Sequence, residues 1–161
     1  MNNKILTTEQ AIQKTTKLNE QGKRIVLAGG CFDILHIGHI TFLKEAQRQG
    51  DLLFVFVESD ETIKKLKGNN RPLNSQDDRA EILSHLDVVD YVIKLEPKTN
   101  NNFYDQLVMQ LKPAIIATTA GDINRIHKER QAKLIDAKVV DVTAPIKNQS
   151  TTRLIHVLNE L

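Results

Sequence analysis

The sequence lacks several features that would place the protein in a special class. Cys31 is the only cysteine, which excludes an internal disulfide and fits a reducing compartment. No apolar run approaches the length of a membrane span, and the start, Met1 to Lys4, lacks the apolar core of a signal peptide. We therefore expect a cytoplasmic protein that does not act at a membrane.

An excess of charge of one sign is also missing. The 22 basic and 20 acidic residues are interleaved and leave a net charge of +2, so neither a nucleic-acid surface nor an acidic tail is indicated. A chain of 161 residues with 40% hydrophobic residues is long enough for one core and short for two. We expect residues 1–161 to form a single domain, with residues 1–22 as an N-terminal helical extension.

Short apolar runs alternate with amphipathic stretches along the chain. The runs at 24–28, 52–57, 87–95, 114–117 and 138–142 have the composition of strands. Helices are expected at 7–19, from near 38 to 49, at 59–66, from 75, at 103–111, at 123–135 and after 149. This alternation predicts an α/β fold with a doubly wound sheet of five parallel strands. The strand at 24–28 should be central, because the loop that follows it must lie at a switch point to admit a ligand.

That loop carries the densest motif, Gly30-x-Phe32-Asp33-x-x-His36-x-Gly38-His39. Six fixed positions of this kind would arise by chance at roughly one start in a hundred million. A helix beginning near Gly38 offers unpaired N–H groups, and glycine has no Cβ to keep an anion away from them. His36 and His39 stand three apart and can project from one side of the first turn. The pattern predicts a phosphate site.

Two other interpretations of the histidines are weaker. A single histidine at a helix start is usually a satisfied polar residue, but two histidines around a glycine after a strand make this reading poor. A zinc pair is also poorly supported, because Cys31 is the only cysteine and no further cluster has metal-ligand spacing. We expect no metal held by the protein's own side chains.

A basic cluster follows the second expected strand, with Lys64, Lys65, Lys67 and Arg71 in and after a short helix. Such a cluster is more often a solvated face than a site. In an alternating β/α chain it can return to the carboxyl edge that carries the histidine loop. The segment 68–70, Gly-Asn-Asn, is flexible enough to close over a bound anion, although a surface turn would have a similar composition.

The motif resembles the signature of the cytidylyltransferase-like nucleotidyltransferases, a Rossmann-like superfamily. Four further segments are most similar to the adenylyltransferase domains of bacterial ADP-heptose synthases. They are Leu66-Lys67-Gly68, Arg71-Pro72-Leu73-Asn74, Asp78-Arg79-Ala80-Glu81-Ile82-Leu83 and Val89-Asp90-Tyr91-Val92. The late Ser150-Thr151-Thr152 is similar to a family segment that holds the β- and γ-phosphates. One departure stands out, because Thr119 occupies the place of a lysine in the Lys-Gly-Gly-Asp segment of those domains. The identities of the acceptor and of the nucleobase therefore stay open at this level.

The resemblance implies a reaction and a set of site residues. A phosphate oxygen of an acceptor such as a sugar phosphate attacks the α-phosphorus of ATP, or of CTP, and pyrophosphate leaves. His36 and His39 would contact the triphosphate, Lys67 would brace phosphate or acceptor, and Arg79 would reach the leaving pyrophosphate unless it forms a salt bridge on the helix surface. Nucleotide binding is expected from a further set: Gly30, Cys31, Phe32, Asp33, Gly38, Asp122, Ser150, Thr151 and Thr152.

Several alternatives stay open at this level. Mg²⁺ would be carried by the triphosphate, and Asp33 would either orient the metal, acceptor or a backbone amide, or only cap the turn. The acceptor could instead be a polyol phosphate used by a cytidylyltransferase, or a flavin as in an FAD-synthase-like adenylyltransferase. A regulatory module that binds nucleotide without turnover is the non-enzymatic alternative. A homodimer is expected from the family's habit of pairing, with the apolar stretch 86–95 as its interface.

Overall fold

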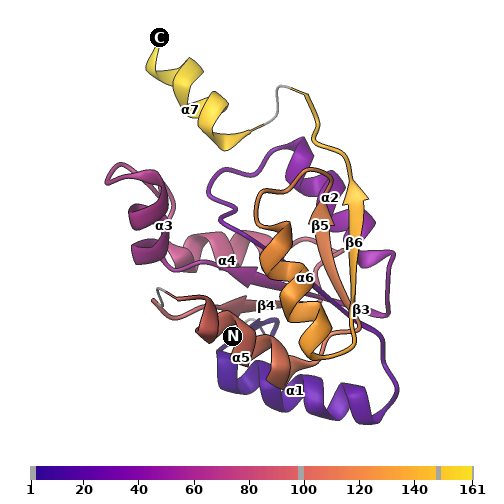
Figure 1. The fold of residues 1–161 in the computed structure, drawn as a ribbon. Helices are drawn as coiled ribbons and strands as arrows, with labels where there is room; N and C mark the ends of the chain where they lie inside the picture. Colours follow the sequence, from indigo (N-terminus) through magenta and orange to yellow (C-terminus); the bar gives the residue numbers. More distant parts are fainter. Residues whose placement is uncertain (1–2, 98–99, 148–149, 161) are drawn as a thin grey trace.

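The computed structural model describes residues 3–97, 100–147 and 150–160. In these residues six parallel strands form one open sheet in the order β1-β4-β3-β2-β5-β6 (Figure 1). The strands are β1 (Ile5–Leu6), β2 (Ile25–Gly30), β3 (Leu52–Val57), β4 (Tyr91–Lys94), β5 (Ile115–Thr119) and β6 (Lys138–Thr143). The predicted parallel, doubly wound architecture is confirmed.

The number of strands was predicted wrongly, as five rather than six. The additional strand, β1, has two residues and pairs with β4 at Ile5–Val92 and Leu6–Ile93. A two-residue strand is too short to show a periodic pattern in the sequence. β1 forms because residues 5 and 6 pair with the edge of β4. The predicted strand at 87–95 is shorter, at Tyr91–Lys94.

The helices cover both faces of the sheet. They are α1 (Thr8–Glu20), α2 (Ile37–Gln47), α3 (Asp60–Lys67), α4 (Gln76–Ser84), α5 (Asn101–Leu111), α6 (Arg125–Leu134) and α7 (Thr151–Asn159). One core cluster joins α2 and α4 to Val26, Leu53 and Val55 of the strands. The other joins α1, α5 and α6 to the alternate strand residues Leu27 and Phe54. Because successive strand residues point to opposite faces, both faces need apolar side chains, which explains the nearly continuous apolar runs.

β2 lies inside the sheet, between β3 and β5. The chain moves outward from β2 through β3 to β4 and then returns across the sheet to β5. The loops that leave β2 and β5 therefore lead away from each other, and the carboxyl end of β2 is a switch point of the kind where ligands bind in open parallel sheets. The predicted central place of this strand is confirmed.

Two further features concern the surface. The stretch 86–95, predicted as a dimer interface, is largely core: Val92 and Ile93 are fully buried between β3 and β1. This stretch therefore offers little surface for pairing two copies. Within the described ranges, no helix has both the length and the apolar character needed to cross a membrane. Helix α7 extends away from the sheet and buries none of its residues (Figure 1).

Gly50, between α2 and β3, provides a test of this packing. A Cβ at this position would lie 2.5 Å from the carbonyl oxygen of Arg24 and 2.7 Å from a methyl group of Val26, so β2 would have to shift. We expect Gly50→Ala to lower the free energy of unfolding by about 3 kcal/mol, as overpacking does when backbone must move. Urea unfolding gives this value. In the control Gly22→Ala, the Cβ meets no atom within 4 Å and only the positive φ of +71° opposes the change, for about 1 kcal/mol. Equal losses in the two variants would contradict the packing argument.

Candidate active site

The loop after β2 begins with a tight reversal at Phe32, whose φ is +49°. A left-handed conformation is unfavourable for a residue with a large side chain, and it persists only where the surroundings hold it. Here the buried Phe32 ring packs against Gly30, where an added Cβ would lie 3.1 Å from the ring. A side chain at position 30 would therefore press against this ring, and the chain then continues toward α2.

His36 is the N-cap of α2, so the helix begins at Ile37, one residue earlier than predicted. Its Nδ1 accepts a hydrogen bond of 3.1 Å from the N–H of Gly38. The neutral ring then carries its proton on Nε2, where it can be donated to a ligand. The N–H of Gly38, which the sequence predicted to face an anion directly, is used to orient the histidine.

The rings of His36 and His39 are stacked, with centroids 3.8 Å apart and an angle of 25° between their planes. The Phe32 ring lies against His39 at 5.3 Å. Burial, together with the neighbouring His36, lowers the pKa of His39 to about 4, while the backbone of Ile34 acts weakly in the opposite direction. Burial also lowers the pKa of His36. The Nδ1 of His39 is buried and makes no hydrogen bond of acceptable geometry to the described residues. Both rings are therefore neutral donors near pH 7 in the free protein.

Asp33 acts inside the protein rather than in a cavity. Its carboxylate accepts hydrogen bonds from the guanidinium of Arg71 at 2.6 Å and from the N–H groups of Leu73 and Asn74 at 2.8 and 3.0 Å. Although burial raises the pKa of Asp33, these hydrogen bonds outweigh it and hold that pKa below its usual range. Of the roles considered for Asp33, the geometry supports the one in which it orients backbone amides, here those of Leu73 and Asn74, since both oxygens are already occupied. The hydrogen bonds tie residues 71–74 to the histidine loop.

Arg79, predicted to reach the leaving pyrophosphate, is fully buried. Its guanidinium donates to the carbonyl oxygens of Cys31 at 2.7 Å, Glu58 at 2.7 Å and Asn74 at 3.1 Å. It also forms an ion pair with Asp60 at 2.7 Å. Arg79 lines neither of the cavities described below. The Arg79 side chain thus holds three loops together at the carboxyl edge of the sheet. It is not placed to contact a pyrophosphate in either cavity, and it does not form the predicted salt bridge on the helix surface.

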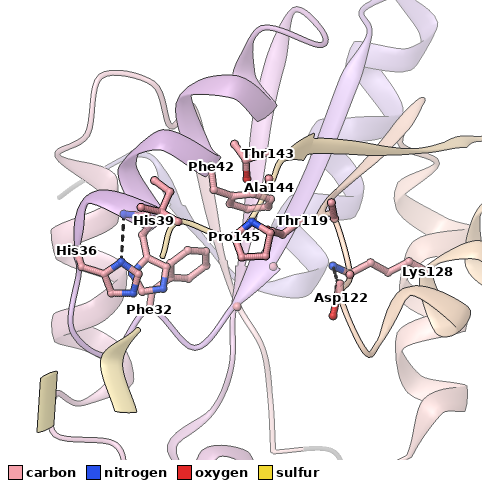
Figure 2. A pocket seen from close by; sticks show the side chains of 16 residues that line it. Phe32, His36, His39, Phe42, Thr119, Asp122, Lys128, Thr143, Ala144 and Pro145 are labelled. Carbon is pink, nitrogen blue, oxygen red and sulfur yellow. Dashed lines mark hydrogen bonds and ion pairs between the residues drawn. The ribbon is translucent and has the colours of Figure 1, made fainter. Parts of the chain in front are cut away.

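A first cavity of about 370 Å³ opens at the end of β2. Figure 2 shows the histidines and Phe32 on one side of it and the turn after β5 on the other. Gly29, Gly30 and Gly38 are among the residues that line it. The remaining wall comes from the ends of β5 and β6 and includes Thr119, Ala120, Thr143, Ala144, Pro145 and Ile146.

A second cavity of about 510 Å³ lies on the other side of the same strand end. Glu58, which follows β3, and Tyr104 of α5 are polar groups in its wall, and the tyrosine hydroxyl donates to both carboxylate oxygens at 2.9 Å. Burial raises the pKa of Glu58 and also that of Tyr104. Asn101 and His127 add further polar groups, and Cys31, Lys65 and Leu66 complete the side near α3.

The two cavities share Gly29, Gly30, Asp122 and Lys128. Lys128, from α6, donates to the Asp122 carboxylate at 2.7 Å and to the Thr118 hydroxyl at 3.0 Å (Figure 2 marks the ion pair). The Thr118 hydroxyl donates to the same Asp122 oxygen at 2.8 Å. Burial raises the pKa of Asp122, but the hydrogen bonds from Lys128, Asn124 and Thr118 outweigh it and lower that pKa. A fixed ion pair therefore stands where the two cavities meet.

The remaining predicted site residues lie near the cavities. The Lys67 charge acts on both Cys31 and His39, which places it close to the motif, but it lines neither cavity. Thr151 donates its hydroxyl to the carbonyl oxygen of Ile34 at 3.2 Å, and Ser150 caps α7. Ser150, Thr151 and Thr152 are beside the histidine loop without lining either cavity.

Sequence reasoning missed Lys128 and the Glu58–Tyr104 pair. Lys128 belongs to a helix rich in charged residues, where nothing distinguishes one lysine from another before the helix is placed. Glu58 and Tyr104 are 46 residues apart and come from different elements. Their position directly after β3 and in the first turn of α5 is the only signal that the sequence offered, since carboxyl-edge residues of parallel strands gather at one site.

The described residues contain no group of three or more histidines, cysteines, aspartates or glutamates that could hold a metal ion. Asp33, the nearest acid to the histidines in the motif, is occupied by its own hydrogen bonds.

Comparison with known proteins gives consistent matches. Residues 27–157 match the family model described as Cytidylyltransferase-like. The Bifunctional protein HldE of Aliarcobacter butzleri (strain RM4018) is 44% identical over 159 residues, which cover 99% of this chain and 32% of that protein. The Bifunctional protein HldE of Campylobacter concisus (strain 13826) is 46% identical over 140 residues, covering 86% and 28%. The chain thus spans less than a third of the length of these relatives.

Solved structures agree. The crystal structure of the lipopolysaccharide core biosynthesis protein from Thermoplasma volcanium GSS1 superposes with a TM-score of 0.63 at 31% identity, over 80% of this chain and 100% of that one. The pantoate-beta-alanine ligase from Francisella tularensis has a TM-score of 0.60 at 19% identity, over 97% of this chain and 76% of that one. At this identity, the second likeness shows only a shared fold.

The histidine environment predicts an unusual titration. In the free protein, the ring protons of His39 should titrate with a midpoint near pH 4, measured by NMR and assigned with His39→Gln. Because the unfolded chain binds this proton first, near pH 6.5, the free energy of unfolding should decrease as the pH falls from about 6.5 to about 4. The decrease should be smaller in His39→Gln. A midpoint near 6.5 in the folded protein would show that the ring is not buried as described.

Proposed function

The chain belongs to the cytidylyltransferase-like family, and on this premise we propose that it is a nucleotidyltransferase that transfers a nucleoside monophosphate to a phosphorylated acceptor. A phosphate oxygen of the acceptor attacks the α-phosphorus of the triphosphate, a new O–P bond forms, and the bond to the β-phosphate breaks. Pyrophosphate leaves with the bonding electron pair. The favoured triphosphate is ATP, by the resemblance to adenylyltransferase domains, and the favoured acceptor is a sugar phosphate.

The observation that carries this proposal is the meeting of two cavities at Gly29 and Gly30. Two substrates must be bound at once for direct transfer, and each cavity is large enough for part of one of them. Gly29 and Gly30 line both cavities, so the same strand end borders both proposed substrates. The triphosphate belongs on the side of the histidines and the acceptor on the side of Glu58.

The chemistry needs donors and orientation rather than a base. An acceptor phosphate is already ionised near neutral pH, so no proton has to be removed from the nucleophile. His36 presents Nε2–H because Gly38 occupies its Nδ1, and His39 lies stacked beside it. Hydrogen bonds from these rings to the triphosphate oxygens strengthen as charge develops around the α-phosphorus. Mg²⁺ arrives on the triphosphate as part of the substrate and neutralises its β- and γ-oxygens.

The second cavity favours an acceptor that carries hydroxyl groups. The Glu58 carboxylate is held by the Tyr104 hydroxyl and keeps lone pairs for further donors, while Asn101 and His127 lie in the same wall. A sugar or polyol phosphate supplies several hydroxyl donors, whereas an apolar acceptor would leave the remaining lone pairs of the Glu58 carboxylate without donors. The Thermoplasma volcanium relative is described as a lipopolysaccharide core biosynthesis protein, and this description also favours a sugar phosphate as the acceptor of this chain.

The test is a pyrophosphate-release screen of ATP and CTP against sugar phosphates, polyol phosphates and a flavin phosphate, with the nucleotide products identified by mass. We expect turnover with ATP and a sugar phosphate. Turnover with CTP and a polyol phosphate would replace the substrate assignment and keep the reaction class. Tight triphosphate binding with no pyrophosphate released from any pair would support the regulatory alternative instead.

The histidines separate catalysis from binding. We expect His36→Ala and His39→Ala each to lower kcat by about a hundredfold with a much smaller change in the KM for the triphosphate, since their contacts strengthen in the transition state. Thr151→Ala should cost less, because its hydroxyl lies outside both cavities. His85→Ala, at an exposed ring that follows the last residue of α4, is the matched control and should leave both constants unchanged. A raised KM with unchanged kcat would mean that the histidines contribute only uniform binding.

A further inference from the structure

Lys128 stands at the one place that both substrates must reach. Among the lysines and arginines of the described residues, Lys65 borders only the second cavity, whereas Lys128 borders both. Its side chain is 22% exposed and that of Asp122 is 18% exposed, so the pair is neither fully solvated nor sealed in the core. In Figure 2 the lysine reaches from α6 toward the turn after β5, across the cavity from the histidines.

The hydrogen bonds of Lys128 hold its ammonium group in place and leave one of its N–H donors free. An ammonium group has three N–H donors, and two of them go to Asp122 and Thr118. The Asp122 carboxylate is in turn fixed by the N–H of Asn124 at 2.9 Å and by the Thr118 hydroxyl. One N–H of Lys128 is therefore left for a ligand, on a group whose position is already set before the ligand binds.

The proposed reaction creates a need for such a charge. The attacking acceptor phosphate and the α-phosphate are both anions, and they must come within bonding distance at the shared end of β2. The two histidines stand on the triphosphate side and are neutral in the free protein, so they supply hydrogen bonds but little charge. A fixed cation at the boundary lowers the repulsion between the phosphates and orients the attacking oxygen.

We propose that Lys128 is a catalytic residue that binds the acceptor phosphate at the boundary between the two cavities and holds it beside the α-phosphorus. Lys128 remains an ammonium throughout: it forms no covalent bond and transfers no proton, while the new bond joins the acceptor oxygen to the α-phosphorus and pyrophosphate departs. Asp122 and Thr118 position the lysine. This inference rests on the proposed function, because it assigns the acceptor to the second cavity.

The main test compares Lys128→Met, which keeps an unbranched side chain one atom shorter and removes its charge, with Lys128→Arg, which keeps the charge. With the acceptor that the wild type uses, we expect Lys128→Met to lower kcat/KM for the acceptor by about a hundredfold and to leave the Kd for the triphosphate within about threefold. Lys128→Arg should retain clearly more activity than Lys128→Met. Lys133→Met removes an exposed charge from the same helix outside both cavities and should behave as wild type.

A double variant distinguishes this role from a structural one. Lys128→Met leaves the Asp122 carboxylate without its ion pair, which by itself could disturb the turn after β5. In Lys128→Met/Asp122→Asn that charge is removed as well. We expect the double variant to stay as slow as Lys128→Met; recovery of activity would show that the lysine only neutralises Asp122 and would overturn the inference.

Failure of the inference and failure of the function give different results. If the wild type turns over and Lys128→Met matches it, or if Lys128→Arg is as slow as Lys128→Met, the inference is wrong and the nucleotidyltransferase assignment stands. If the wild type releases no pyrophosphate with any acceptor, the proposed function fails, and the catalytic role of Lys128 fails with it.

Discussion

The carboxyl edge of the sheet depends on one buried guanidinium. Arg79 is fully buried and binds carbonyl oxygens from the loop after β2, the loop after β3 and the segment before α4. A buried charge of this kind is tolerated only when nearly all of its donors are satisfied, so these three segments must keep their positions. With the carbonyl of Cys31 turned inward to Arg79, the chain reverses at Phe32 and delivers His36 to the start of α2. The hydrogen bonds of the buried Arg79 thus help to fix the position of the loop that carries the histidines.

The charged residues of the motif region fall into two groups. One group holds loops together and lines neither cavity; it consists of Asp33, Arg71 and Arg79. The titratable groups that line the first cavity are two neutral imidazoles and the ion pair between Lys128 and Asp122, so this cavity carries little net charge. Such a site suits phosphates that arrive partly neutralised by Mg²⁺. In the proposed reaction, fixed hydrogen-bond donors would stabilise the transition state, because they need no reorganisation when charge moves.

The sequence determined the general architecture because its strongest signals are local. Alternating apolar runs and helical patterns predict a parallel sheet, and the glycine-rich motif predicts its own place at the end of β2. β1 could not be found in this way, since two residues have no period. Arg79 sits among Asp77, Asp78 and Glu81 on a helix, a composition typical of a solvated face, and only the convergence of three distant loops buries it. Lys128 likewise gains its meaning from the turn after β5, which α6 meets only in the folded protein. The roles of Arg79 and Lys128 depend on contacts between distant elements, and the local sequence around each residue does not show these contacts.

The central claim is that two phosphate groups, bound together on either side of Gly29 and Gly30, react directly with each other. The most direct test is the configuration at the α-phosphorus after transfer from a triphosphate made chiral there by sulfur substitution. A single in-line displacement by the acceptor oxygen inverts this centre, and inversion is the predicted result. Retention would require two displacements through a covalent intermediate on the protein, with an imidazole as the obvious nucleophile, and would contradict an account in which the histidines act only as hydrogen-bond donors.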